Sequence, residues 1–147
     1  LGVTGGSYGG YMTLWIIGHT KRFQAAITDR CVSNFISEWG SSDVNWTFEY
    51  EVEAEPPYKD FKKWWDMSPM KYIGNAKTPT LVQHYENDLR CPIEQGEQVF
   101  VALKRLGVDT EFVRYPDEFH GMSRTGRTDR RIERIKHILR WFDKYLK

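Results

Sequence analysis

The sequence predicts an α/β domain in which helices flank a mostly parallel sheet of about four strands. Two observations support this prediction. Short apolar runs alternate with longer segments of helical period along the 147 residues, an order typical of parallel strands joined by crossover helices. The composition, 40% hydrophobic and 28% charged, fits a folded chain with its own core. We therefore treat residues 1–147 as one domain.

The first half of the chain starts with a strand and a helix. Residues 1–4 are expected to end a buried strand, and residues 8–19 to form a helix. The apolar face predicted for this helix carries Tyr11, Met12, Trp15 and Ile16. Residues 23–28 (FQAAIT) form the next strand. Residues 31–56 are expected to leave the sheet in an excursion with some helix.

The second half continues the alternation. We expect a helix over 58–66, a strand over 80–84, a helix that opens near Pro92 and ends at Gly107, a strand over 111–115, and a last helix capped by Thr128 or Asp129. The apolar stripe predicted for the last helix consists of Ile132, Ile135, Ile138, Leu139, Phe142 and Leu146.

Composition and spacing argue against several classes of function. A net charge of +1 argues against electrostatic capture of nucleic acid. No apolar run approaches the length of about 18 residues that a membrane span needs. The four histidines have no metal-ligand spacing, so we expect no metal and no cofactor. Cys31 and Cys91 are expected to be free thiols in a reducing compartment, which favours a cytoplasmic location.

The first nine residues contain a candidate nucleophile. Gly5-Gly6-Ser7-Tyr8-Gly9 fits the pattern G-x-S-x-G, in which a strand turns sharply into a helix and exposes the serine at the tip. The backbone N–H of Tyr8, at the helix start, is the predicted oxyanion donor. Because the pentapeptide also occurs by chance as a glycine-rich turn, the interpretation depends on finding an acid and a histidine.

Both partners follow later strands. Asp88 follows the predicted strand 80–84, and His120 follows the strand 111–115. The chain order Ser7, Asp88, His120 is the nucleophile–acid–base order of α/β-hydrolases. Since the carboxyl ends of parallel strands meet at one edge of a sheet, the three side chains are expected to converge there. His120 would serve as the base, and Asp88 would orient its imidazole.

Other residues compete for these roles. Glu86 is a rival to Asp88, and Asp117 and Glu118 lie beside His120 in sequence. An orienting acid usually comes from another loop, which favours Asp88. His84 is interpreted as a core histidine.

Three residues are candidates for substrate binding. Arg90 follows the acid loop, where it would bind a substrate carboxylate or carbonyl, or else form a structural ion pair. Trp39 and Trp46 lie in the excursion after the second strand, where α/β-hydrolases often build substrate pockets.

Several segments resemble one known family. Residues 5–10 (GGSYGG) resemble the elbow of the prolyl oligopeptidase family of serine peptidases. Residues 78–107 and 111–127 resemble the acid and histidine segments of its acylaminoacyl-peptidase branch, and residues 131–146 resemble its last helix. The resemblance covers nearly the whole chain. It departs from the branch at Tyr85 and around His120, without removing a triad residue.

The resemblance implies an α/β-hydrolase fold, of which this chain would be the C-terminal portion, since the relatives have a β-propeller and further strands before the elbow. The implied substrates are short peptides or N-acyl-peptides, with small esters as the alternative for a carboxylesterase. A third alternative is an inactive, associating fragment. We expect an open sheet edge at the first strand to pair with another copy of the chain, giving a homo-oligomer.

Overall fold

The computed structural model describes residues 1–146 and confirms the α/β class. Among these residues one sheet of four strands runs in the order β1 (Gly2–Ser7), β2 (Ala25–Cys31), β3 (Thr80–Tyr85) and β4 (Thr110–Tyr115). Each neighbouring pair is parallel. All four carboxyl ends therefore lie at the same edge of the sheet.

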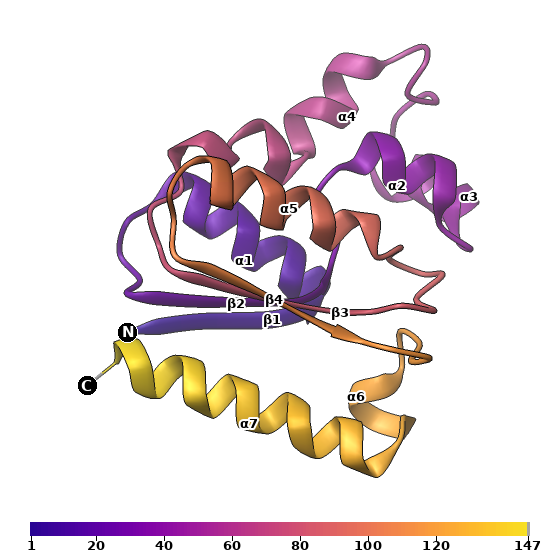
Figure 1. Cartoon of the computed structure of the whole chain (residues 1–147). Coiled ribbons are helices and arrows are strands. Elements are labelled where there is room, and N and C mark those ends of the chain that lie inside the picture. Colours follow the sequence, from indigo (N-terminus) through magenta and orange to yellow (C-terminus); the bar gives the residue numbers. More distant parts are fainter. Residues whose placement is uncertain (147) are drawn as a thin grey trace.

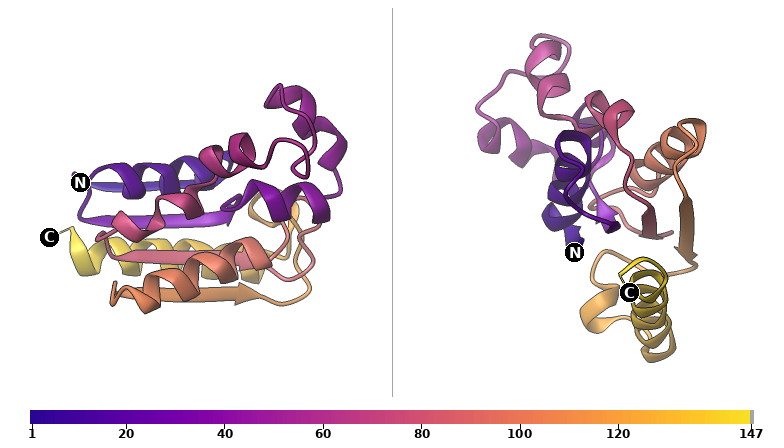
Figure 2. Two further views of the ribbon diagram at one scale, coloured as in Figure 1. Left: turned by 90° about the horizontal axis from the view of Figure 1, so that it is seen from above. Right: turned by 90° about the vertical axis from the view of Figure 1, so that its left-hand side faces the viewer.

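Helices lie on both faces of the sheet. In chain order the helices of the described residues are α1 (Tyr8–His19), α2 (Phe35–Ser41), α3 (Asn45–Glu51), α4 (Phe61–Met67), α5 (Glu94–Arg105), α6 (Met122–Thr125) and α7 (Thr128–Tyr145), with short 3-10 turns η1 (Pro69–Lys71) and η2 (Ile73–Asn75). Helices α1 and α5 cover one face and α7 covers the other, so the molecule has three layers (Figures 1 and 2). Helices α2 and α3 lie past the carboxyl ends of the strands (Figure 1).

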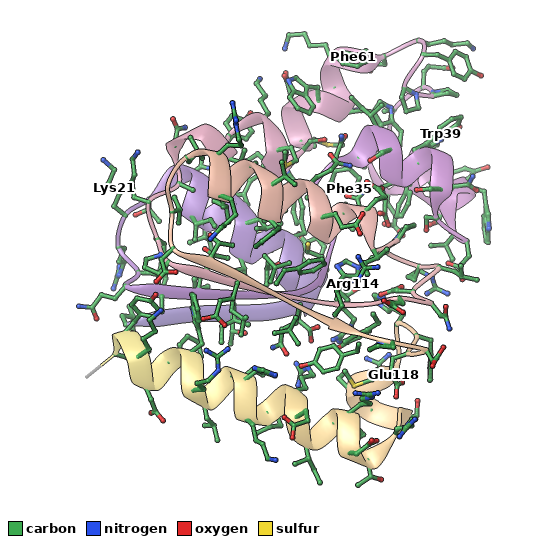
Figure 3. All side chains as sticks on the ribbon, viewed as in Figure 1. Lys21, Phe35, Trp39, Phe61, Arg114 and Glu118 are labelled. Carbon is green, nitrogen blue, oxygen red and sulfur yellow. The ribbon has the colours of Figure 1, made fainter. Side chains whose placement is uncertain are left out.

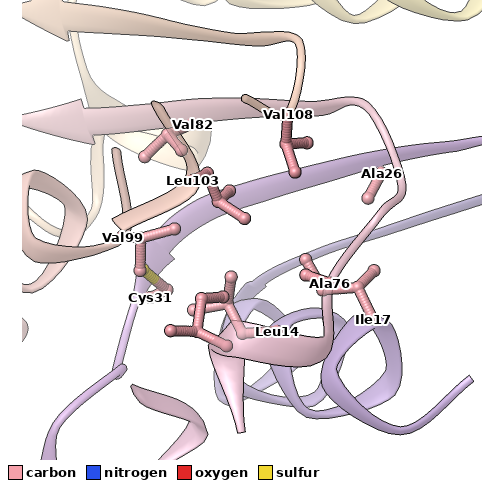
Figure 4. Close-up of a cluster of buried hydrophobic side chains, with 10 residues drawn as sticks. Leu14, Ile17, Ala26, Cys31, Ala76, Val82, Val99, Leu103 and Val108 are labelled. Carbon is pink, nitrogen blue, oxygen red and sulfur yellow. The ribbon is translucent and has the colours of Figure 1, made fainter. Parts of the chain in front are cut away.

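The main core lies between the sheet and the layer of α1 and α5 (Figure 4). Leu14 of α1, Val82 of β3 and Val99 of α5 are fully buried there. All residues of β2 and β3 are buried, as expected for central parallel strands covered on both faces. This packing fixes the strand ends from which the candidate site residues extend.

The predicted apolar face of α1 is wrong in detail. The buried residues are Gly10, Thr13, Leu14, Ile17 and Gly18, whereas the predicted residues are only half-buried. This helix packs against other elements on two sides, so it carries apolar residues on both. The outward ring of Tyr11 contacts Phe35 of the excursion, and that of Trp15 contacts Tyr72, the residue between η1 and η2. A helix enclosed in this way has no single hydrophobic stripe.

For the last helix, the predicted cap is wrong and the predicted apolar stripe is confirmed only in part. Neither Thr128 nor Asp129 caps α7, because the helix already includes both residues and Arg127 precedes it without a side-chain cap. Asp129 instead forms an ion pair with Arg127 (Nη2···Oδ2, 2.8 Å).

Only part of the apolar stripe predicted for α7 faces the sheet. Buried Trp141 packs there with Ile138 and Phe142. The stripe residues that are about half exposed are Ile132, Ile135 and Leu139.

Candidate active site

Ser7 occupies a strained turn between β1 and α1. Its φ of 59° and ψ of −121° lie outside the regions that non-glycine residues usually adopt. The pairing of β1 with β2 is also irregular here, since Gly6 pairs with Asp29 and Ser7 with Cys31. A strain of this kind costs about 1–3 kcal/mol and persists where the surrounding structure enforces it. The geometry is the sharp strand-to-helix turn that the G-x-S-x-G pattern predicts.

The glycines around Ser7 differ in what they do. A Cβ on Gly5 would lie 2.4 Å from the carbonyl oxygen of Gly9, and a Cβ on Gly10 would lie 2.8 Å from the carbonyl oxygen of Asp29. These two positions therefore allow α1 to approach β1 and β2 closely. A Cβ on Gly9 would meet nothing within 4 Å. The sequence pattern alone does not distinguish these positions.

His120 joins Ser7 to Asp88. Its Nε2 lies 2.9 Å from Ser7 Oγ. Its Nδ1 lies 2.8 Å from Asp88 Oδ2 and 3.0 Å from Oδ1. Ser7 ends β1, and Asp88 and His120 follow β3 and β4, so the structure brings together the side chains that the sequence analysis singled out. The arrangement gives a hydroxyl next to a base, and a base held by a carboxylate.

The loop after β3 holds the Asp88 carboxylate in place. Asp88 Oδ1 accepts the backbone N–H groups of Arg90 at 3.0 Å and Cys91 at 2.9 Å. The carboxylate is fully buried, whereas the His120 side chain is 17% exposed. Bonds from backbone N–H groups to a carboxylate are strong and directional. They leave Asp88 Oδ2 aligned with the imidazole.

The rival acids are engaged elsewhere. Glu86 pairs with Arg114 (Nε···Oε1, 3.2 Å). Glu118 is buried and accepts the backbone N–H of Arg127 at 3.1 Å, and Asp117 is exposed. His84 is buried in β3 with Nε2 at 2.8 Å from the carbonyl oxygen of Cys91, so it is a core histidine.

The backbone N–H of Tyr8 lies at the beginning of α1. The first N–H groups of a helix have no carbonyl partner within the helix, and they lie at the positive end of its dipole. Because Tyr8 directly follows Ser7, this group is available to an oxygen that develops negative charge beside Ser7 Oγ.

A cavity of about 470 Å³ lies beside Ser7. It is lined by Ser7, Tyr8, Tyr11, Val32, Phe35, Glu38, Val44, Thr47, Phe48, Glu51, Val52, Met67, Arg90 and Cys91. Most of these residues come from the excursion between β2 and β3. The cavity therefore lies between the strand ends and the helices α2 and α3.

The predicted substrate-binding residues occupy different places. Arg90 lines the cavity, and at the same time its guanidinium forms an ion pair with Asp43 (Nε···Oδ1, 2.6 Å). Trp39 and Trp46 are not among the lining residues. The Trp39 indole N–H donates to Glu49 Oε1 at 2.9 Å, and Trp46 is 67% exposed. Figure 3 places Phe35, which does line the cavity, nearer to the strands than Trp39.

The sequence analysis missed Glu38. This α2 residue is fully buried, and among residues 1–146 neither Oε atom accepts a hydrogen bond from an N–H or O–H group. Burial raises the pKa of its carboxyl to about 9, and the negative charges of Glu94 and Asp88 raise it further, while the neighbouring Cys91 thiol opposes the rise. A single glutamate in an aperiodic segment gives no sequence signal that it will be buried.

The described residues contain neither a candidate metal centre nor a helix that could span a membrane. Within residues 1–146, no group of three or more His, Cys, Asp or Glu side chains is arranged to hold a metal ion. Over the same residues no helix combines the length and the apolar character needed to cross a membrane.

Comparison with known proteins identifies the family. The sequence pattern of the prolyl oligopeptidase family matches residues 1–147. The uncharacterized peptidase YuxL of Bacillus subtilis is 52% identical over 147 residues, and the acylamino-acid-releasing enzyme of Arabidopsis thaliana is 36% identical over 154 residues. Each alignment covers 99% of this chain but only 22% and 20% of those proteins.

The fold agrees with this relationship. Uncomplexed acylaminoacyl peptidase of Pyrococcus horikoshii superposes with a TM-score of 0.94 at 33% identity, over 99% of this chain and 24% of that one. The sheet and its flanking helices thus belong to an α/β-hydrolase fold. The chain belongs to the prolyl oligopeptidase family of serine peptidases and resembles its acylaminoacyl peptidases.

Proposed function

We propose that Ser7, His120 and Asp88 form a catalytic triad that hydrolyses peptide or N-acyl-peptide bonds through an acyl-enzyme. The observation that carries the proposal is the position of the His120 ring, with Nε2 at 2.9 Å from Ser7 Oγ and Nδ1 at 2.8 Å from Asp88 Oδ2. Membership of a serine peptidase family supports the same roles.

The acylation step follows from this geometry. Ser7 Oγ attacks the substrate carbonyl carbon while His120 Nε2 takes the hydroxyl proton. The Tyr8 backbone N–H stabilises the negative oxygen of the tetrahedral intermediate. The intermediate collapses when the C–N bond breaks, and His120 gives its proton to the leaving amine. Asp88 stabilises the imidazolium that exists between these transfers.

Deacylation reuses the same groups. His120 takes a proton from a water molecule, whose oxygen attacks the acyl carbon of the Ser7 ester. When the bond to Ser7 Oγ breaks, the proton returns to the serine and the acid product leaves. Both steps are neutral overall and need no metal or cofactor.

The substrate class is inferred from the relatives. The acylamino-acid-releasing enzymes and the acylaminoacyl peptidase among the relatives support short peptides or N-acyl-peptides as substrates. The chain spans about a fifth of the length of the curated relatives it matches. The activity and substrates of the whole protein are therefore part of this proposal.

Active-site labelling tests the proposal. A fluorophosphonate should form one adduct per chain, located on Ser7 by mass spectrometry. Ser7→Ala should abolish the adduct, and His120→Ala should slow it strongly. If the folded wild-type chain forms no adduct, the triad is not functional. Turnover of matched N-acetyl-peptide amides and esters then separates a peptidase from a carboxylesterase, since only a peptidase cleaves the amides efficiently.

A further inference from the structure

The buried carboxyl of Glu38 lines the cavity in an environment that the proposed catalysis does not explain. It lines the same cavity as Ser7 and Tyr8. It is fully buried, and within residues 1–146 neither Oε atom accepts a hydrogen bond from an N–H or O–H group, although the Cys91 thiol, a weak donor, lies beside it. A buried polar group without a partner is costly, and such groups in native proteins are rare. Both oxygen atoms are shielded from solvent, so a molecule in the cavity reaches them when a lining side chain moves aside.

The electrostatic surroundings of Glu38 favour a cation. The carboxyl groups that raise its pKa come from three segments: Glu94 on α5, Asp88 after β3 and Asp43 after α2. The negative charges that oppose ionisation of Glu38 also attract a cation to this part of the cavity. Among residues 1–146 the only cation that lines the cavity is Arg90, and its Nε is paired with Asp43 Oδ1 at 2.6 Å.

The remaining walls of the cavity are mostly apolar. They include the side chains of Phe35 and Phe48, together with Val44 and Val52 of the excursion and Met67 of α4. Such walls suit the methylene stem of a long basic side chain, whose charged end then reaches the carboxyl. A purely apolar side chain would fill the walls but leave Glu38 unpartnered. Apolar walls with one buried carboxyl therefore favour an amphipathic cation.

We propose that this cavity receives a basic side chain, that of arginine or lysine, at the residue whose carbonyl Ser7 attacks. Glu38 is its partner and a specificity-determining residue. The inference rests on the proposed function of Ser7, since the cavity lies beside that nucleophile. On binding, the Glu38 carboxyl gives up its proton to solvent and forms an ion pair with the cation. Arginine provides two parallel N–H donors for the two free Oε atoms.

Hydrolysis of matched esters tests the preference. N-acetyl-arginine and N-acetyl-citrulline thiobenzyl esters have side chains of nearly the same shape, but only arginine is charged. We expect kcat/KM to favour arginine by about tenfold or more in the wild type, as for a charged hydrogen-bonded pair. Glu38→Gln should bring the ratio close to one by lowering the kcat/KM of the arginine ester. Glu51→Gln, at the exposed lining residue Glu51, should keep the arginine preference.

Calorimetry tests the same inference without turnover. Nα-acetyl-arginine methylamide should bind to Ser7→Ala about tenfold or more tightly than its citrulline counterpart. Comparing buffers of different ionisation enthalpy at pH 7 should show release of about one proton. The double variant with Glu38→Gln should show neither effect.

The outcomes separate the two proposals. If both esters are hydrolysed equally, or if Glu38→Gln keeps the arginine preference, the inference about Glu38 is wrong and the function of Ser7 stands. If Ser7 is unreactive but the arginine amide binds with proton release, the binding site is real and the proposed function is wrong. Equal or undetectable binding of both amides overturns the inference whether or not Ser7 reacts.

Discussion

His120 Nε2 lies 2.9 Å from Ser7 Oγ although 113 residues separate the two in the chain. The two residues come from opposite sides of the described sheet, whose outer strands are β1 and β4. They meet only when β2 and β3 hold the outer strands at the right separation. The candidate site therefore depends on the whole sheet, and changes in the sheet or its turns should alter reactivity at Ser7.

The carboxylate of Asp88 should matter for rate more than for binding. Asp88→Asn keeps an oxygen that accepts the N–H groups of Arg90 and Cys91, so the fold should be retained. The amide favours the wrong imidazole tautomer, and kcat should fall about 10⁴-fold with little change in KM. Steady-state kinetics on an activated ester measures both. Glu86→Gln is the control, and an equal loss there would contradict the assignment of the acid.

Gly5 and Gly9 provide a matched pair for the turn at Ser7. Gly5→Ala places a methyl 2.4 Å from the Gly9 carbonyl oxygen, and we expect it to lower the free energy of unfolding by about 1–3 kcal/mol and to slow Ser7 labelling. Gly9→Ala meets open space in a helix and should raise that free energy by about 0.5–1 kcal/mol. Urea denaturation measures both, and similar values for the two variants would rule out this steric explanation.

Glu38 should make the stability of the protein depend on pH. The carboxyl ionises near pH 4.5 in the unfolded chain and near pH 9 in the folded one. Between these values the folded state holds one more proton, so the free energy of unfolding falls as pH rises, by at most about 1.4 kcal/mol per pH unit.

Glu38→Gln removes this titration. Relative to the wild type it should gain about 1 kcal/mol or more between pH 5 and pH 8. Urea denaturation of both proteins at the two pH values measures the gain. Parallel stability curves would show that Glu38 ionises normally in the folded protein.

The two cysteines should be unreactive in the folded state. Burial raises the pKa of the Cys31 thiol to about 12, and it raises the pKa of Cys91 as well. Since the thiolate is the nucleophile, iodoacetamide at pH 8 should modify neither residue in the native protein and both in urea. Mass spectrometry over time measures this. Rapid native alkylation of Cys91, beside the cavity, would show that the site opens.

The grouping of the three candidate site residues was predictable because each lies at the carboxyl end of a strand with a clear apolar pattern. Chain order and the geometry of parallel strands then bring Ser7, Asp88 and His120 together. The cavity was not predictable, because its walls come from residues 31–56, which have no period. Trp39 and Trp46 were chosen from that segment for their size, whereas tertiary contacts decide which side chains face inward.

The helix faces show the same limit. Which residues of α1 are buried depends on the elements that pack around the helix. In α7, Ile132 and Leu139 are exposed although both belong to the predicted apolar stripe. Association of copies through the edge of β1 stays a prediction.

The separation of the three site residues onto three strand ends has a kinetic consequence. Parallel strands pair only after long loops close, so contacts distant in sequence tend to form late in folding. Neither an isolated hairpin nor a local cluster can place an imidazole beside Ser7. The rate at which a covalent label reacts with an activated serine therefore reports when β4 docks onto the sheet. During refolding it should lag behind the appearance of helical signal.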